Sequence, residues 1–232
     1  MELKLLSKTP GGAFGSCRLK LKDYVKSERE FQRIYEVFKA HNIEYFFYNG
    51  GGDSQDTTFK VSKMAKELKL PLTCIGIPKT VDNDLPITDC SPGFGSVAKY
   101  VATSTLEAGL DVKSMSETST KVFILEVMGR HAGWIAAASV LAARNENDPP
   151  HIILMPEVPF VKKKFIYKVK QTVANEGFCV VVASEGTRYK NGMFLADSGL
   201  TDAFGHKQLG GVAPVLAQMI SSIGLKNHWA VS

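Results

Sequence analysis

The hydrophobic positions of this chain follow two patterns that alternate along its length. Short, almost continuous apolar runs predict buried strands at residues 43–48, 72–77, 121–127, 151–155, 178–183 and 229–231. Apolar residues at helical spacing predict helices at residues 27–40, 55–70, 95–114, 133–144, 163–175 and 210–223. Because helices of this length separate the strands, we expect βαβ units. The fold class is then α/β with three layers, in which helices cover both faces of a parallel sheet.

Composition limits the class of ligand and the place where the chain acts. At 232 residues it can form one large domain or two small ones. Its formal net charge of +5 suits an anionic small molecule, and the lack of a basic stripe interleaved with aromatic residues argues against nucleic acid. No apolar run is long enough to span a bilayer, and the first residues do not form a signal peptide. We therefore expect a cytoplasmic protein without membrane contact.

The most polar loop, PKTVDND at residues 78–84, follows the predicted strand at residues 72–77. In open α/β sheets, ligands bind at the loops that leave the carboxyl ends of the strands. Asp82 and Asp84 are two residues apart, so in an extended loop both carboxylates point toward one ligand or metal. Lys79 adds a mobile positive charge, so the loop is a candidate for phosphoryl transfer with Asp82 as the base. The alternative is a polar turn in which Asn and Asp favour the left-handed conformation.

A glycine-rich loop follows the first predicted strand. Its three glycines, residues 50–52, let the backbone approach a ligand closely and take positive φ. Ser54 is a suitable N-cap for the next helix, whose free N–H groups attract an anion, and Asp53 can hold Mg²⁺ by a carboxylate oxygen. The alternative is a tight turn with a capping aspartate. The side chains that this helix is expected to turn inward are Phe59, Val61, Met64, Ala65 and Leu68.

A third loop, MGRHAGW at residues 128–134, again follows a predicted strand. Arg130 offers a planar fork of donors to a phosphate, and Gly129 gives it room to reach. We expect His131 to be structural. Glu185, after the strand at residues 178–183, can accept hydrogen bonds from sugar hydroxyls or else cap a turn.

One glycine pattern favours a different class of enzyme. Residues 93–98, GFGSVA, imitate a dinucleotide fingerprint, and a nicotinamide-dependent oxidoreductase is therefore a weak alternative. Ser91 and Pro92 precede the pattern where a strand is required, so its context is missing. The chain contains no Walker A sequence, no HExxH and no G-x-S-x-G.

Three loops, in this order and at these spacings, resemble those of the phosphofructokinases: GGD at residues 51–53, PKTVDND at 78–84 and MGR at 128–130. The resemblance runs over nearly the whole chain. It implies a phosphofructokinase-like fold and phosphorylation of the 1-hydroxyl of fructose 6-phosphate with Mg²⁺, a reaction of glycolysis and gluconeogenesis. It also implies a donor-binding part at residues 1–120 and a sugar-phosphate-binding part at residues 121–232.

The resemblance further implies roles for individual residues. Asp82 would be the general base, and Asp53 would bind Mg²⁺. The residues that would assist catalysis are Lys79, Asp84 and Arg130. The residues that would bind the sugar phosphate are Thr80, Val81, Met128, Gly129, Arg130 and Glu185. Those that would contact the phosphoryl donor are Arg18, Gly51, Gly52, Ser54 and Lys79. Lys121 lies where relatives often have an arginine that reaches across a subunit boundary to the sugar phosphate, which implies a homo-oligomer, a dimer or a tetramer.

Two positions bear on the phosphoryl donor. In the family, glycine directly after the GGD motif and glycine before the threonine of the second loop go with ATP, whereas pyrophosphate-dependent members tend to have aspartate and lysine. This chain has Ser54 and Lys79. Lysine suits an inorganic phosphate leaving group, because its charge offsets the charge that develops on that group. The segments at residues 50–57 and 202–206 also look more like the pyrophosphate branch, so we expect pyrophosphate, with ATP as the alternative.

The resemblance is incomplete at both ends. Family members begin with a strand and a glycine-rich loop for the donor phosphates, and they carry a C-terminal segment whose arginine, often with a histidine, holds the sugar 6-phosphate. We expect neither element in this chain. A sheet without them exposes edges and apolar faces. We therefore expect little or no turnover by the chain alone, and the alternative function is an inactive fragment or a non-catalytic binding or regulatory homologue.

Overall fold

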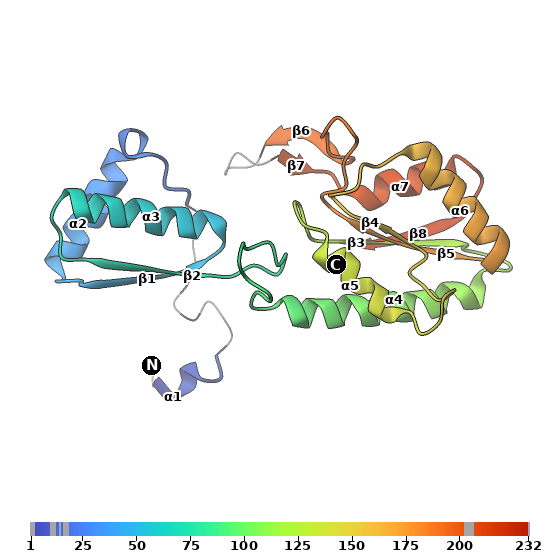
Figure 1. The fold of residues 1–232 in the computed structure, drawn as a ribbon, viewed down its shortest axis with the longest axis horizontal. Coiled ribbons are helices and arrows are strands. Elements are labelled where there is room, and N and C mark those ends of the chain that lie inside the picture. Colours follow the sequence, from blue (N-terminus) through green and yellow to red (C-terminus); the bar gives the residue numbers. More distant parts are fainter. Residues whose placement is uncertain (1–2, 10–12, 14, 16–18, 202–206, 232) are drawn as a thin grey trace. The chain divides into compact units, whose positions relative to one another are not determined.

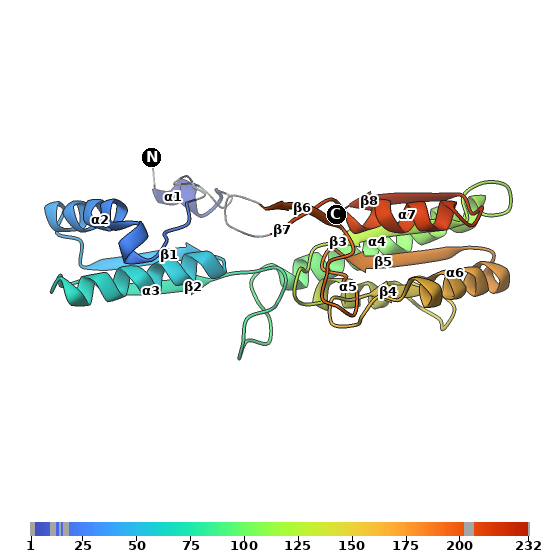
Figure 2. The ribbon, with the colours of Figure 1, turned by 90° about the horizontal axis from the view of Figure 1, so that it is seen from above.

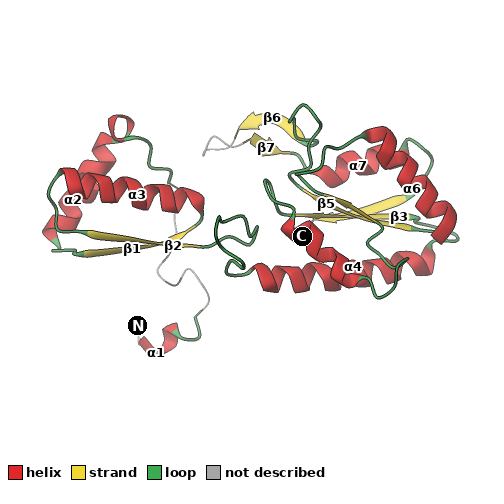
Figure 3. Cartoon of the chain, viewed as in Figure 1, coloured by secondary structure: helices red, strands yellow, loops and turns green. Residues whose placement is uncertain are grey.

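The computed structural model describes residues 3–9, 13, 15, 19–201 and 207–231, and its contacts divide the chain into two compact units, Met1–Pro78 and Lys79–Ser232. Each unit has parallel strands with helices packed against them (Figure 1, Figure 3). The predicted α/β class is confirmed. The predicted boundary at residue 120 divides a donor-binding part from a sugar-phosphate-binding part. The packing units do not test a division by function, so this boundary stays a prediction.

The first unit is a two-stranded parallel sheet with helices over one face. Its strands are β1, Tyr45–Gly50, and β2, Thr73–Pro78, with Gly50 opposite Pro78 at their carboxyl ends. Its helices are α1 (Leu3–Leu6), the 3-10 helix η1 (Tyr24–Lys26), α2 (Glu28–Ala40) and α3 (Gly52–Glu67). In Figure 1, α2 and α3 lie over the same face of this sheet.

Side chains of β1 and β2 alternate between a covered face and an open face. Phe46 and Cys74 face the helices and pack against a cluster of buried residues, Leu21, Phe31, Val61 and Met64. The large apolar side chains that are exposed on these strands are Tyr45, Phe47, Ile75 and Ile77. Because successive side chains of a strand point to opposite faces, these four share the second face of the sheet. The sheet therefore has an open apolar face.

Helix α3 begins earlier than predicted. It starts at Gly52, and Gly51 is its N-cap in an extended conformation. The prediction that Ser54 caps this helix is wrong, because Ser54 already lies in its first turn. None of residues 50–52 has a positive φ, so that expectation is wrong as well. Glycine is required at position 50 for a different reason, because a Cβ there would lie 2.1 Å from Ser54 Oγ.

Only part of the predicted inner stripe of α3 is buried. Val61, Met64 and Ala65 are buried, but Phe59 is 69% exposed and Leu68 is 41% exposed. Helix α3 packs against β1, β2 and α2, and Phe59 lies outside the stripe that these elements cover.

The second unit contains a four-stranded parallel sheet in the order β4-β5-β3-β8. The strands are β3 (Val122–Val127), β4 (Ile152–Leu154), β5 (Cys179–Ser184) and β8 (Asn227–Val231). The helices are α4 (Phe94–Met115), α5 (Trp134–Ala138), the 3-10 helix η2 (Ser139–Ala142), α6 (Lys162–Glu176) and α7 (Val212–Ser221). In Figure 1 the sheet lies between α4 and α5 on one side and α6 and α7 on the other, so this unit has the predicted three layers.

The two faces of this sheet follow from the alternation of β3. Val122 and Ile124 pack with α6 and α7, whereas Leu125 and Val127 pack with α4 and α5. Seen from above, α7 lies along β8 and α6 along β5 (Figure 2). Both central strands are buried on both faces, which explains why their sequences are almost continuously apolar.

Two features of the second unit differ from the prediction. The helix predicted at residues 133–144 divides into α5 and the 3-10 helix η2. A short antiparallel hairpin, β6 (Asp197–Thr201) with β7 (Lys207–Leu209), has no counterpart in the predicted elements, because its sequences carry no run of apolar residues. Within the described ranges, no helix combines the length and the apolar character needed to cross a membrane.

Candidate active site

The loop after β2 is a compact turn rather than an extended segment. Asn83 has a φ of 54°, in the left-handed region. The prediction that Asp82 and Asp84 point the same way assumes an extended loop, and that assumption is wrong. The Asp82 N–H donates to Thr80 Oγ1 at 3.2 Å, and the Asn83 N–H donates to the Thr80 carbonyl at 3.4 Å. The backbone forms the polar turn of the alternative interpretation. The hydrogen bonds of this turn do not use the Asp82 carboxylate, which stays available to a ligand.

Asn83 holds this turn in place. Its side chain is 7% exposed, its Nδ2 donates to the Asp89 carbonyl at 3.2 Å, and its Oδ1 accepts from the Ser91 N–H at 2.8 Å. Asparagine tolerates positive φ better than most residues, and here it also satisfies two backbone groups. Val81 anchors the turn on the other side, because it packs against the buried cluster beneath α4. The turn is therefore fixed to the second unit.

The loops after β3 and β5 leave neighbouring strands at the same edge of the sheet. Val127 pairs with Ser184, and the Glu185 N–H donates to the Val127 carbonyl at 2.9 Å. Gly129 has a φ of 125°, and a Cβ there would lie 2.5 Å from the Ala132 carbonyl oxygen. Only glycine fits at this position. The loop that carries Met128, Gly129 and Arg130 therefore begins beside Glu185, and each follows a strand as the sequence predicts.

Asp82 lies within a group of charged side chains from these loops. Burial raises the pKa of the Asp82 carboxyl, the negative charges of Asp84 and Glu185 raise it further, and His131 and Arg130 oppose the rise. Among the described residues, neither the buried Oδ1 of Asp82 nor the buried Nε of Arg130 has a hydrogen-bond partner. Buried polar atoms that lack a protein partner call for an explanation, and a ligand that completes the site is one. His131, expected to be structural, is exposed and belongs to the same group.

In the first unit, four of the predicted donor and metal residues lie where β1 ends: Gly51, Gly52, Asp53 and Ser54. Lys79, also predicted to contact the donor, belongs to the second unit. Asp53 lies in the first turn of α3, its side chain is 41% exposed, and a carboxylate oxygen lies 3.3 Å from Lys20 Nζ. The Ser54 hydroxyl turns back toward Gly50 at the end of the strand. Asp53 belongs to the first unit and Asp82 to the second, so a pocket shared by the two stays a prediction.

Two predicted contacts are not brought into this group. Lys121 precedes β3, at the opposite end of the strand from Arg130, and its Nζ donates to the Ser116 carbonyl. Its predicted role crosses a subunit boundary and stays a prediction. Arg18 and the segment at residues 202–206 lie outside the described residues.

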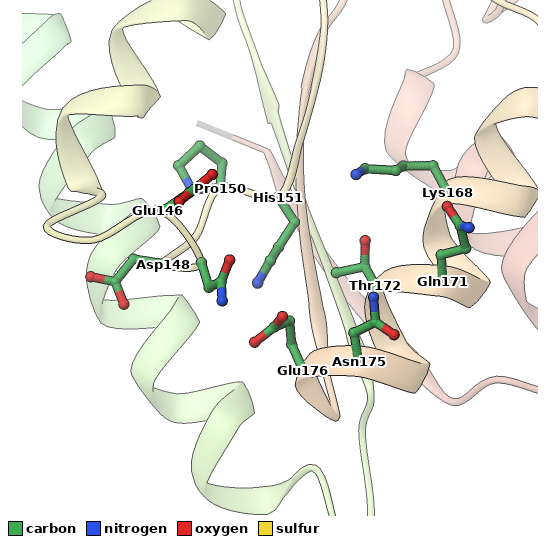
Figure 4. Close-up of a pocket in the computed structure, with 10 residues that line it drawn as sticks. Glu146, Asp148, Pro150, His151, Lys168, Gln171, Thr172, Asn175 and Glu176 are labelled. Atoms are coloured by element: carbon green, nitrogen blue, oxygen red, sulfur yellow. The ribbon is translucent and has the colours of Figure 1, made fainter.

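A polar pocket of about 270 Å³ lies at the other edge of the sheet of the second unit (Figure 4). Residues from α6 and from the segment before β4 line it, among them His151 and Glu176. His151 precedes β4, whereas Arg130 and Glu185 follow their strands, so the pocket and the charged group occupy opposite edges of a parallel sheet. None of the predicted site residues that the structure describes lines this pocket. It is therefore not the predicted substrate site.

Three residues outside the predicted set contact or shape the site loops. Asn83 fixes the turn that carries Asp82. The Ser184 hydroxyl donates to the Gly129 carbonyl, and Arg188 Nη2 donates to the Arg130 carbonyl at 3.1 Å. Ser184 carries a weak signal in the sequence, because it is the polar residue that ends an apolar strand. Arg188 carries none, since its partner lies 58 residues earlier in the chain.

Comparisons with known proteins identify the family to which these loops belong. The family model described as Phosphofructokinase matches residues 2–229. A relative from Halomonas elongata, named pyrophosphate--fructose 6-phosphate 1-phosphotransferase, is 63% identical over 98% of this chain and 54% of its own length. The crystal structure of a pyrophosphate-dependent phosphofructokinase from Marinobacter aquaeolei is 60% identical and has a TM-score of 0.79, over 98% of this chain and 52% of that one. A relative from Streptomyces coelicolor named ATP-dependent 6-phosphofructokinase 3 is 38% identical over 69% of this chain.

The chain spans about half the length of the curated relatives it matches, 54% for the one from Halomonas elongata. The match nevertheless extends over almost all of the present sequence, and it includes the three loops whose geometry is described above. A family model that covers residues 2–229, together with a relative of this identity, leaves one assignment: the chain belongs to the phosphofructokinase family.

Proposed function

We propose that this chain carries the catalytic and sugar-binding loops of a pyrophosphate-dependent phosphofructokinase, which phosphorylates the 1-hydroxyl of fructose 6-phosphate. The observation that carries the proposal is the group around Asp82. Its carboxylate has a raised pKa and a buried oxygen with no hydrogen-bond partner in the described part of the chain, and the charges of Arg130 and Glu185 act on it. A carboxylate whose pKa is raised toward neutrality is a stronger base than an exposed one.

In this reaction Asp82 accepts the proton of the 1-hydroxyl. The hydroxyl oxygen forms a bond to one phosphorus of pyrophosphate, the bridging P–O bond breaks, and orthophosphate leaves. The Thr80 hydroxyl accepts from the Asp82 N–H, so its own proton can be donated to a substrate oxygen. Arg130 holds a phosphate of the sugar, and Glu185 accepts hydrogen bonds from sugar hydroxyls. Lys79 offsets the charge on the departing phosphate.

The metal in this proposal is Mg²⁺, and Asp53 is the residue that would hold it. No group of three or more His, Cys, Asp or Glu side chains that could hold a metal occurs among the described residues. This fits Mg²⁺, which usually binds through one or two carboxylates, substrate phosphates and waters. Lys20, 3.3 Å from Asp53, would have to yield the carboxylate to the cation. When bound, Mg²⁺ supplies positive charge that offsets the charge on the transferred group.

Pyrophosphate is proposed as the donor on two grounds. Three relatives that share 56–63% identity with this chain carry the pyrophosphate name, whereas a relative named ATP-dependent shares 38%. Lys79 and Ser54 also stand where ATP-dependent members of the family tend to have glycine. ATP is the alternative donor.

The test is calorimetry of the purified chain with fructose 6-phosphate, followed by an aldolase-coupled assay with Mg²⁺ and either donor. Binding of the sugar phosphate is expected, and any turnover is expected to require pyrophosphate and Mg²⁺. Product formed with ATP alone would refute the donor, and an Asp82→Ala variant with the wild-type rate would refute the base. Binding without turnover would favour the non-catalytic alternative.

A further inference from the structure

The loop that carries Arg130 is held by the segment after β5 through its backbone. Ser184 Oγ donates to the Gly129 carbonyl, and in turn accepts from the Gly186 N–H at 3.1 Å. Arg188 Nη2 donates to the Arg130 carbonyl at 3.1 Å. A Cβ on Gly186 would lie 2.1 Å from that same carbonyl oxygen, so the two segments are in direct contact. The segment after β5 therefore fixes the carbonyls of Gly129 and Arg130.

Arg188 is suited to this contact by its own surroundings. Its guanidinium lies over the Phe194 ring, with Cζ 5.0 Å from the ring centre, and its backbone carbonyl accepts from the Phe160 N–H at 2.8 Å. The ring and the backbone bond fix the side chain from both ends. A planar guanidinium can stack on a ring and direct an N–H sideways at a carbonyl, which a lysine ammonium cannot do in the same way.

The same arginine leaves a polar atom unsatisfied. Its Nε is buried and has no hydrogen-bond partner among the residues that the structure describes. A buried donor without a partner lowers stability, so this nitrogen does not account for the arginine. The side chain is better explained by what its other nitrogen does, which is to fix one carbonyl of the loop that carries Arg130.

We propose that Arg188 is a positioning residue for the sugar-phosphate site: it holds the Arg130 carbonyl, and thereby directs the Arg130 guanidinium toward the phosphate of the sugar. No described residue accepts a hydrogen bond from the buried Arg130 Nε, so that nitrogen does not fix the side chain, whereas the Arg188 bond does fix the backbone from which it extends. The inference rests on the proposed function for the identity of the ligand. The contact between Arg188 and the Arg130 carbonyl does not depend on the proposed function.

The experiment combines two measurements on the 232-residue chain and its variants. Calorimetry measures the dissociation constant of fructose 6-phosphate, and hydrogen exchange follows the peptide that covers residues 128–134. The variants are Arg188→Ala, Arg188→Lys, and Lys190→Ala as the matched control, since Lys190 is an exposed cation two residues further on. Arg188→Ala is also titrated with millimolar guanidinium, which can occupy the vacated position.

For Arg188→Ala, we expect the dissociation constant to rise between about tenfold and a hundredfold, because small displacements of positioning groups have effects of this size. Exchange over residues 128–134 becomes faster in the same variant, and guanidinium restores part of the affinity. Arg188→Lys lies between this variant and the wild type, and Lys190→Ala matches the wild type. If Arg188→Ala does not fold, Arg188→Lys carries the same comparison without the guanidinium titration.

An unchanged dissociation constant would overturn the inference, and so would weaker binding with neither faster exchange over residues 128–134 nor restoration by guanidinium. If the wild-type chain does not bind fructose 6-phosphate, the proposed function fails, and the exchange measurement alone decides on Arg188. Faster exchange confined to residues 128–134 would then support its positioning role, and unchanged exchange would refute it.

Discussion

Replacing Glu126 by glutamine is expected to destabilise the second unit by about 1–2 kcal/mol, because it removes a buried charge from a helix N-terminus while keeping the size of the side chain. Glu126 is on β3 and is 5% exposed. Its Oε2 accepts from the N–H of Ala213 at 2.8 Å, and Ala213 is the second residue of α7. One carboxylate thus joins the central strand to a helix on the sheet.

The magnitude follows from the two kinds of bond. A hydrogen bond to a charged group contributes about 1.5–3 kcal/mol, and a neutral one about 1 kcal/mol, so glutamine retains only part of the contribution. Glu126→Ala leaves the Ala213 N–H without a partner and opens a cavity, so we expect a loss of about 3 kcal/mol or more. For a unit of this size, 1 kcal/mol corresponds to roughly 2–4 °C in Tm.

Glu157→Gln is the matched control. Glu157 also accepts a backbone N–H, from Gly133 at 2.7 Å, but the residue is exposed. An exposed charge is screened by solvent, so its loss is expected to cost less than about 1 kcal/mol. Urea unfolding followed by tryptophan fluorescence measures both variants. A Glu126→Gln chain as stable as the wild type, or an equal loss in Glu157→Gln, would refute the reasoning.

Three further predictions concern pH and packing. Burial and neighbouring carboxylates raise the pKa of Asp82 above its ordinary 3.8, so the stability of the wild type falls as pH rises from 3.8 through the folded pKa. Asp82→Asn lacks this fall and is expected to be more stable than the wild type at pH 7. Urea titrations over pH 3–8 measure the difference. Burial lowers the pKa of His151 below its ordinary 6.5, so stability is lost as pH drops from 6.5 through the folded pKa; His151→Gln should lose less over that range, and an unchanged slope would contradict this. A Cβ at Gly186 would meet two carbonyl oxygens, at 2.1 and 2.7 Å, so Gly186→Ala is expected to cost about 1–3 kcal/mol by the same unfolding assay, whereas Gly95→Ala, with open space around it, is neutral or stabilising.

Sequence patterns predict the elements whose environment is uniform along their length. The strands β3 and β5 are buried on both faces, so their apolar runs identify them and place the loops at Met128 and Glu185 correctly. The start of α3 was predicted wrongly because Gly51 and Ser54 are both acceptable near a helix N-terminus, and local preferences do not choose between them.

Such patterns do not identify residues whose partners are distant in the sequence. Glu126 contacts a backbone group 87 residues away, and Arg188 contacts one 58 residues away. In the sequence Glu126 is simply a charge inside a strand, and Arg188 is a cation in a polar loop. The turn at Asn83 is an intermediate case, since the preference of asparagine for positive φ is local but its bonds to Asp89 and Ser91 are not.

The open apolar face of β1 and β2 has a practical consequence for anyone who follows the unfolding of this chain. A sheet of two strands with only one side covered buries little surface, so the first unit has the smaller reserve against heat or urea. Both tryptophans, Trp134 and Trp229, belong to the second unit. A fluorescence melt would therefore record a folded protein after Met1–Pro78 had already come apart, and only far-UV dichroism or tyrosine signals would register the earlier event.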